Sequence, residues 1–192
     1  MTTTPRIVVG ISGASGAMIG IRIVELLATA GCEIHLVVSR SGERTIGHEA
    51  GDDELCRIGA LACVHHAIDD IGATIASGSF RTAGMIVAPC SMRTLSAIAT
   101  SSADNLLTRA ADVHLKERRR LVLLARETPL HLGHIRMMAA ATEMGAIVAP
   151  PVPAYYRRPQ SVADIIDHTA RRAIDLLDLD IAALAEPWRG LR

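Results

Sequence analysis

The sequence predicts an α/β fold: one domain whose parallel, doubly wound sheet is covered by helices on both faces. Apolar segments rich in β-branched residues alternate with apolar-periodic segments along the chain. The apolar segments are uninterrupted, as is typical of strands that are buried on both faces and joined through helices. The 192 residues, 49% of them hydrophobic, suffice for one domain with a full core.

The elements follow in a regular order. A strand at 6–12 leads into a glycine-rich turn, Gly13 to Gly16, and a helix from about 17 to 30. The further strands are expected at 33–39, 84–88 (ended by Pro89), 121–125 and 146–149, and the further helices at 41–50, 52–62, 91–99, 104–118, 131–144 and 161–177. We expect 70–82 to be a loop near the ligand and 150–153 a stiff turn. A tail begins at about 179, where Trp188 is expected to pack against this or a neighbouring subunit.

Composition excludes several classes of protein. The 20 basic residues balance the 20 acidic ones, and aromatic residues make up only 2%, which argues against nucleic-acid binding. No apolar run is long enough to span a membrane, and residues 1–5 do not resemble a signal peptide. The four cysteines have no zinc spacing, so a cytoplasmic protein with reduced thiols is expected, with Cys32, Cys56 and Cys63 in the core.

The first turn predicts an anion site. A strand, a turn of small residues and a helix start leave backbone N–H groups without helical partners, and the helix dipole favours negative charge there. Ser15 lies in this turn, where serine is commonly an N-cap, and capping is compatible with contact to a ligand. The same two roles apply to Ser91 and Thr94 at a later helix start.

The carboxyl ends of the predicted strands carry the other polar groups. Ligands of doubly wound sheets bind at this edge. The ends offer Gly13, Ala14 and Ser15, then Ser39 and Arg40, then Cys90 to Thr94, then Arg126 to Pro129, and finally Tyr155 to Pro159. Small hydroxyls, arginines and a carboxylate suit a phosphate and a polar ring.

The glycine spacing favours a mononucleotide over a dinucleotide. The glycines are Gly10, Gly13 and Gly16, which departs from G-x-G-x-x-G, and the second strand ends in Ser39 rather than an acid. NAD is therefore disfavoured, although Arg40 leaves a 2′-phosphate on NADP open. FMN, with one phosphate and no second ribose, fits better.

Other charged groups have simpler explanations when taken alone. The cations from Lys116 onward suit a helix C-terminus. His65 with His66, and His131 with His134, lack a convincing third ligand, so no metal site is predicted.

Seven segments, taken in order, resemble the flavin prenyltransferase family of the UbiX type over nearly the whole chain. They are Gly10 to Gly16, Ser77 to Phe80, Pro89 to Leu95, Asn105 to Asp112, Leu115 to Arg119, Arg126 to His134, and Pro150 to Tyr156 with Arg158 to Ser161. The family has a Rossmann-like, flavodoxin-like fold.

This resemblance implies a specific reaction. Such proteins join the dimethylallyl group of dimethylallyl monophosphate to N5 of reduced FMN and then close a fourth ring at C6. Prenylated FMN then serves a UbiD-type decarboxylase, and the implied assembly is a homododecamer. By motif, the FMN contacts fall on Gly13, Ala14, Ser15, Ser39, Ser91, Met92, Arg93, Thr94 and Arg126. The prenyl-phosphate contacts fall on Arg109, Lys116, Tyr156 and Arg172, and the catalytic set is Ser15, Glu49, Lys116 and Glu127.

These residue types fit the implied chemistry without a metal. Cleavage of the C–O bond places charge on the leaving phosphate, which arginine, lysine and a tyrosine hydroxyl stabilise. Ring closure requires loss of the C6 proton, which a carboxylate or the released phosphate can accept. Glu127 follows Arg126, so its carboxylate is expected to stay ionised.

Two departures and two rival functions accompany the resemblance. Arg157 stands where the family pattern has histidine, and Ala50 where it has threonine. One rival is an FMN-dependent cysteine-type decarboxylase, which would require a Pro-x-Met-Asn type segment in place of Pro150 to Tyr156. The other is a non-catalytic flavin-binding accessory subunit of a decarboxylase, which would have no use for Glu49, Lys116, Glu127 and Arg172.

Overall fold

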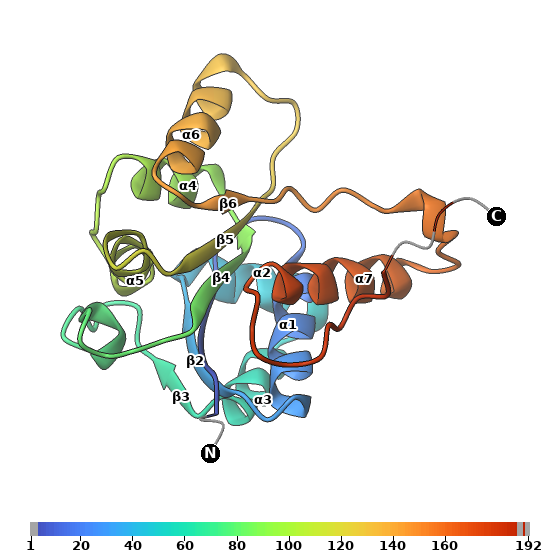
Figure 1. Cartoon of the computed structure of the whole chain (residues 1–192), viewed down its shortest axis with the longest axis horizontal. Helices are drawn as coiled ribbons and strands as arrows, with labels where there is room; N and C mark the ends of the chain where they lie inside the picture. The colour runs from blue at the N-terminus through green and yellow to red at the C-terminus, as the bar shows by residue number, and fades with distance from the viewer. Residues whose placement is uncertain (1–3, 188–189, 191–192) are drawn as a thin grey trace.

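A six-stranded parallel sheet runs through the protein in the order β3-β2-β1-β4-β5-β6 (Figure 1). The computed structural model describes residues 4–187 and 190. Its strands are β1 (Arg6–Ile11), β2 (Glu33–Val38), β3 (Val64–His66), β4 (Gly84–Cys90), β5 (Arg120–Ala125) and β6 (Ile147–Val148). The strand order reverses between β1 and β4, so the crevice that binds ligands in doubly wound sheets lies at their carboxyl ends.

Helices cover both faces of this sheet. They are α1 (Ala17–Thr29), α2 (Arg40–Ala50), α3 (Glu54–Leu61), α4 (Met92–Ala99), α5 (Leu106–Lys116), α6 (Leu132–Glu143) and α7 (Val162–Asp175), with short 3₁₀ turns η1 (Thr74–Ala76) and η2 (Tyr155–Arg157). One apolar cluster joins α1, α2, α3 and α7 to one face, and another joins α4, α5 and α6 to the other. Figure 1 shows the same division, with α7 and α5 on opposite sides of the sheet.

Strand β1 explains why the apolar runs are uninterrupted. Successive side chains of a strand point to opposite faces. Ile7, Val9 and Ile11 accordingly belong to the first apolar cluster and Val8 to the second, and all four are fully buried. The predicted parallel sheet with two covered faces is therefore confirmed.

A close approach of α1 to the sheet depends on Gly20. A Cβ atom at this position would lie 2.1 Å from the carbonyl oxygen of Ala88 in β4. Because real Cβ atoms do not come so near a backbone oxygen, only glycine lets α1 pack at this depth. The helix is thereby fixed against the two strands that flank the crevice.

The prediction for β4 was wrong at its end. Pro89 does not end the strand, which continues to Cys90 with an irregular register on β5 between Val87 and Cys90. Proline has no N–H to donate to a neighbouring strand, so the pairing shifts there while the extended backbone continues.

Strand β3 and two cysteines also depart from the prediction. Val64–His66 is a short strand at the sheet edge, and only His66 is buried in it, so no alternating pattern marks it in the sequence. Cys32 is buried as predicted, but Cys56 and Cys63 are exposed: Cys56 is on α3, which buries only Ile58, and Cys63 follows the end of that helix.

The remaining connections are mostly irregular. The predicted loop at 70–82 holds only η1, and residues 176–187 form no helix or strand. Trp188 lies outside the described residues, so its packing stays a prediction. Within the part of the chain that the structure describes, no helix is long and apolar enough to cross a membrane.

Buried His114 makes stability depend on pH. Its Nδ1 lies 2.7 Å from the carbonyl oxygen of Ala110, and its Nε2 lies 2.8 Å from the hydroxyl of Thr82. Burial lowers the pKa of His114 from 6.5 to about 4, and the nearby positive charge of Arg119 acts in the same direction. The folded protein thus keeps the ring neutral at pH values where the unfolded chain protonates it.

We therefore predict a loss of stability as the pH falls from 6.5 towards 4. Over this window the unfolded state binds a proton that the folded state does not, which removes up to about 3 kcal/mol from the free energy of unfolding. Urea unfolding at several pH values measures it. The slope should flatten in His114→Gln and persist in His65→Gln, a change at an exposed histidine. Equal slopes in all three proteins would contradict the assignment.

Candidate functional site

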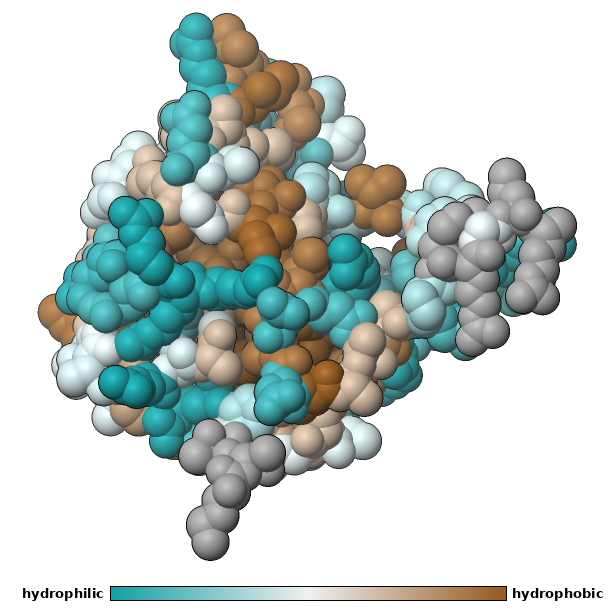
Figure 2. All heavy atoms as spheres, in the orientation of Figure 1, coloured by the Kyte–Doolittle hydropathy of each residue, from teal (hydrophilic) through white to brown (hydrophobic). Residues whose placement is uncertain are grey.

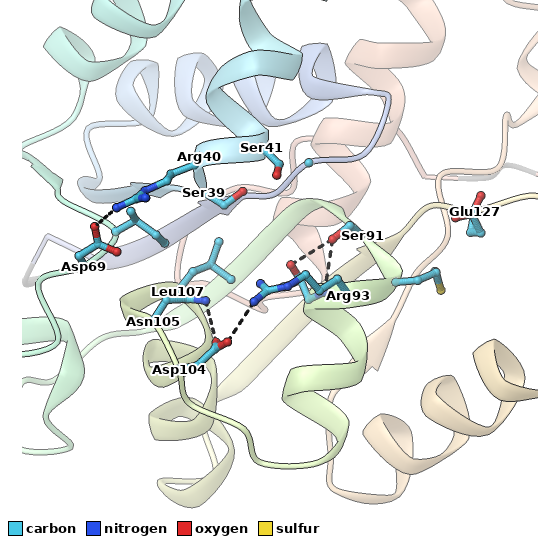
Figure 3. A pocket seen from close by; sticks show the side chains of 14 residues that line it. Ser39, Arg40, Ser41, Asp69, Ser91, Arg93, Asp104, Asn105, Leu107 and Glu127 are labelled. Atoms are coloured by element: carbon cyan, nitrogen blue, oxygen red, sulfur yellow. Dashed lines mark hydrogen bonds and ion pairs between the residues drawn. The ribbon is translucent and has the colours of Figure 1, made fainter.

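A cavity of about 460 Å³ opens at the carboxyl ends of the strands, at the switch point between β1 and β4 (Figure 3). Its wall is formed by Gly13, Ser39, Arg40, Ser41, Ile68, Asp69, Ser91, Met92, Arg93, Thr94, Asp104, Asn105, Leu107 and Glu127. Seven of these are predicted site residues: Gly13, Ser39, Ser91, Met92, Arg93, Thr94 and Glu127. The structure thus brings together residues from segments far apart in the sequence.

Three helices begin at this cavity, each with a polar N-cap. Ser39 caps α2 by accepting a hydrogen bond from the N–H of Gly42 at 3.0 Å. Ser91 caps α4 by accepting one from the N–H of Thr94 at 3.3 Å. Asn105 caps α5 with a capping box. Because helix N-termini favour negative charge, this convergence suits a phosphate.

Ser12 ties the two central strands together behind the cavity. Its hydroxyl donates to the carbonyl oxygen of Pro89 at 2.9 Å and accepts from the N–H of Ser91 at 2.8 Å. Its own N–H donates to the same Pro89 oxygen at 3.1 Å. The residue is fully buried, so these bonds are shielded from water. Ser12 therefore fixes where α4 begins, a role that the sequence analysis missed.

The glycine turn and α2 are in contact. A Cβ atom on Gly13 would lie 2.2 Å from the Cβ of Ser41, so a larger residue cannot occupy this position without moving α2. Ser15, two residues on, is exposed and is not the N-cap of α1, which is Gly16 with φ of 104°.

The N-terminus of α1 is already occupied by a side chain of the protein. Glu49 in α2 accepts hydrogen bonds from the N–H of Gly16 at 3.0 Å and of Ala17 at 2.8 Å. The prediction that this helix start attracts a negative charge was therefore correct. The charge at these two N–H groups is the Glu49 carboxylate, and not a ligand phosphate as expected. Beside it, Ser15 and Glu49 line an open depression of about 800 Å³ that also borders Ser41.

Two arginines on the cavity wall are paired with aspartates (Figure 3). Arg40 lies 2.6 Å from Asp69, and Arg93 lies 3.0 Å from Asp104, measured between the guanidinium nitrogens and carboxylate oxygens. All four side chains are exposed, so each pair is open to solvent. The aspartates were not predicted, because one lies in a loop and the other precedes a helix N-cap.

Glu127 and Arg126 do not pair with each other. One carboxylate oxygen of Glu127 accepts a hydrogen bond from the N–H of Thr128 at 3.0 Å. The backbone N–H of Arg126 donates to the carbonyl oxygen of Cys90, while its side chain is exposed and does not line the cavity. Neighbours in an extended segment point in different directions, so adjacency in the sequence does not bring these two side chains together.

Arg109 and Lys116 lie along α5, against the loop that follows η1. Arg109 donates to the carbonyl oxygen of Ala76 at 3.2 Å and pairs with Asp112 at 2.7 Å. Lys116 pairs with Glu117 and approaches Gly78, where a Cβ would lie 2.7 Å from its ammonium nitrogen. These two predicted donor residues thus share one surface.

Tyr156 and Arg172 lie elsewhere in the chain. Tyr156 belongs to η2 and is exposed. Arg172 is on α7 and lines a separate cavity of about 90 Å³ with His168 and Val152. Since α5 and α7 cover opposite faces of the sheet, a single chain does not bring the four predicted donor residues together.

Comparisons with known proteins establish the family. A family model described as Flavoprotein matches residues 1–170. A protein named flavin prenyltransferase UbiX from Thauera aromatica is 56% identical over 185 residues, which cover 96% of this chain and 94% of that protein. The chain belongs to the flavin prenyltransferase family.

Solved structures similar to this family member share its whole fold. AnUbiX (PadA1), solved in complex with FMN and dimethylallyl pyrophosphate, matches with a TM-score of 0.93 and 48% identity, covering 99% of this chain and all of that chain. A structure described as a dodecameric FMN-dependent UbiX-like decarboxylase from Escherichia coli O157:H7 matches with a TM-score of 0.89 and 43% identity, covering 97% of this chain and all of that chain. The predicted Rossmann-like, flavodoxin-like fold is confirmed.

Cys90 is the cysteine nearest in sequence to the residues that line the cavity. Cys90 is fully buried at the end of β4, and burial raises the pKa of its thiol to about 12, so it stays protonated and unreactive. Among the described residues, no group of three histidine, cysteine or acidic side chains is placed to hold a metal ion.

We predict that Ser12→Ala lowers the free energy of unfolding by about 1–3 kcal/mol, because the N–H of Ser91 loses its partner in a partly buried place. Chemical denaturation measures this directly. Ser102→Ala, at an exposed serine outside the cavity, serves as the control and should change little. A Ser12→Ala protein as stable as the control would show that the hydrogen bonds of the Ser12 hydroxyl do not stabilise the fold.

Proposed function

We propose that this protein joins the dimethylallyl group of dimethylallyl monophosphate to reduced FMN, at N5 and then at C6, to give prenylated FMN. The observation that carries the proposal is the cavity at the switch point of a flavin prenyltransferase family member, with three helix N-termini at its wall. The complex of AnUbiX with FMN and dimethylallyl pyrophosphate supports the choice of both substrates.

The cavity fits FMN in size and in polarity. Ser39, Ser91 and Thr94 would hold the phosphate, since they stand at helix N-termini with hydroxyls at the wall. Gly13 and Met92 would flank the flavin ring, with Ala14, Ser15, Arg93 and Arg126 as further contacts. Reduced FMN, when bound, supplies the nucleophilic nitrogen and carbon of the reaction.

Two glutamates are assigned to proton handling. Glu49 is held by the backbone N–H groups of Gly16 and Ala17, next to the exposed hydroxyl of Ser15. Glu127 lines the cavity with one carboxylate oxygen engaged only by its neighbour Thr128. A carboxylate in such a position can accept the proton that ring closure releases.

The donor phosphate needs cations from more than one subunit. Arg109 and Lys116 on α5 lie on the opposite side of the sheet from Arg172 on α7 (Figure 1). If these groups bind one phosphate, as we propose, they come from different copies of the chain. Lys116 and the arginines would then stabilise the charge of the leaving phosphate.

Exposed apolar side chains support such an assembly. Leu132 and Ile135 on α6 are 59% and 51% exposed, and Val152, Tyr155 and Val162 around η2 are 74%, 73% and 72% exposed. Figure 2 shows hydrophobic side chains gathered over α6 at the top of the view. Surfaces of this kind mark protein contacts. With a dodecameric relative among the solved structures, we propose a homododecamer.

The family resemblance also supplies the destination of the product and the extent of the domain. We propose that prenylated FMN passes to a UbiD-type decarboxylase. We also propose that residues 1–192 form one flavoprotein domain, since one sheet contains every strand of the described residues. Cytoplasmic localisation stays a prediction of the sequence.

Anaerobic incubation with reduced FMN and dimethylallyl monophosphate should yield prenylated FMN, detected by mass spectrometry. Glu127→Gln should bind FMN normally but form product about 10²–10⁴-fold more slowly, the range for a general acid–base group. Glu143→Gln, at an exposed glutamate on α6 outside the cavity wall, is the matched control. No product from the wild type would overturn the proposed function, and a fast Glu127→Gln would overturn only the role of this residue.

Co-expression of two impaired variants tests the shared donor site. Lys116→Ala and Arg172→Ala should each weaken the donor interaction about 10- to 100-fold, because each loses a charge-assisted contact to phosphate. When the two are co-expressed, about a quarter of randomly formed interfaces regain both groups, and activity should recover accordingly. Co-expression without recovery would place both groups in one subunit or outside the site.

A further inference from the structure

The two arginines of the flavin cavity are each paired with an aspartate. Figure 3 shows Arg40 directed at Asp69 and Arg93 directed at Asp104, one pair on each side of the cavity. Arg40 opens α2 and Arg93 lies in the first turn of α4, so both cations stand beside the helix N-termini that would receive the phosphate. Each cation is therefore opposed by a carboxylate within 3.0 Å.

The charged side chains of the cavity wall favour release of a bound phosphate more than its retention. Three carboxylates, Asp69, Asp104 and Glu127, stand against two guanidinium groups. An FMN phosphate carries close to two negative charges at neutral pH. Its attraction to the helix N-termini and hydroxyls is thus partly offset by repulsion from neighbouring carboxylates.

This balance differs from what a permanently bound cofactor requires. A resident cofactor is held best by cations that nothing else neutralises. In the proposed reaction the flavin enters as a substrate and leaves as a product in every turnover, so excessive affinity would slow the enzyme.

We propose that Asp69 and Asp104 set the rate at which flavin leaves the cavity, by neutralising Arg40 and Arg93. The proposal rests on the proposed function. The two aspartates reach the cavity from different segments, the loop after β3 and the loop before α5, yet each takes the same place relative to an arginine.

The structure allows the charge to be removed with little other change. Among the described residues, Asp69 bonds through its side chain only to Arg40, while Asp104 also accepts hydrogen bonds from Asn105 at 2.9 Å and Thr108 at 3.3 Å. Asparagine keeps a carbonyl oxygen for such donors. Asp70→Asn is the matched control, because Asp70 adjoins Asp69 and is exposed but does not line the cavity.

The experiment measures flavin affinity and dissociation by fluorescence titration and stopped-flow at low salt. Asp69→Asn and Asp104→Asn should each bind FMN about three- to tenfold more tightly, chiefly through slower dissociation, and the gain should shrink at high salt. Binding of riboflavin, which has no phosphate, should change little. In turnover, the release of prenylated FMN should slow while a single turnover keeps its rate.

Four results would overturn the inference: unchanged FMN affinity, weaker binding, an equal gain for riboflavin, or an equally large change in Asp70→Asn. Weaker binding would mean that the aspartates position the arginines for the ligand, and an equal gain for riboflavin would exclude the phosphate as the group sensed. A change as large in Asp70→Asn would assign the effect to net charge. A wild type that binds FMN tightly but never prenylates it would overturn the proposed function and leave the affinity comparison intact.

Discussion

The hydrogen bonds of Ser12 are the constraint on which the site depends. One buried hydroxyl joins the end of β1 to the end of β4 through Pro89 and Ser91. These are the two strands between which the sheet reverses its order. The bridge fixes the separation of their ends, and the start of α4 follows directly from it. Any ligand that uses the N-terminus of α4 relies on this link.

Small residues let two helices pack closely against these strands and the turn that follows β1. Gly20 lets α1 lie against the backbone of β4, and Gly13 lets the first turn of α2 lie against the glycine turn. Part of the cavity wall consequently consists of glycine and short hydroxyl side chains, among them Gly13, Ser39, Ser41 and Ser91. Such a wall presents N–H groups and hydroxyls at close range, which suits a phosphate more than an extended apolar ligand.

The sequence predicted the fold well because the physics of its strands is local. The apolar runs of β1, β4 and β5 are uninterrupted, that of β2 is interrupted only by His35, and each helix start at the cavity has a serine or asparagine cap. It predicted the edges poorly. Val64–His66 has one buried side chain and no pattern, and the irregular pairing at Pro89 depends on β5, which is distant in the sequence.

The residues of the candidate site were likewise predictable only in part. Residues at strand ends, such as Ser39 and Ser91, were predictable because topology alone places them at one edge. Asp69 and Asp104 were not, since a loop aspartate carries no mark of the arginine it meets. The hydrogen bonds of Glu49 to the α1 N-terminus could not be predicted either, because Glu49 lies on another helix. Arg172 lines a different cavity from these residues, so the structure of one chain does not link it to the site.

The hydrogen bonds between Glu49 and the start of α1 affect how a dinucleotide could bind at this helix N-terminus. Dinucleotide-binding proteins place a pyrophosphate at the N-terminus of their first helix. In this chain that position holds a carboxylate of the protein itself, joined to two backbone N–H groups. A pyrophosphate arriving there would meet a fixed negative charge instead of free donors. The carboxylate of Glu49 thus takes the place at the first helix that a pyrophosphate holds in dinucleotide-binding proteins.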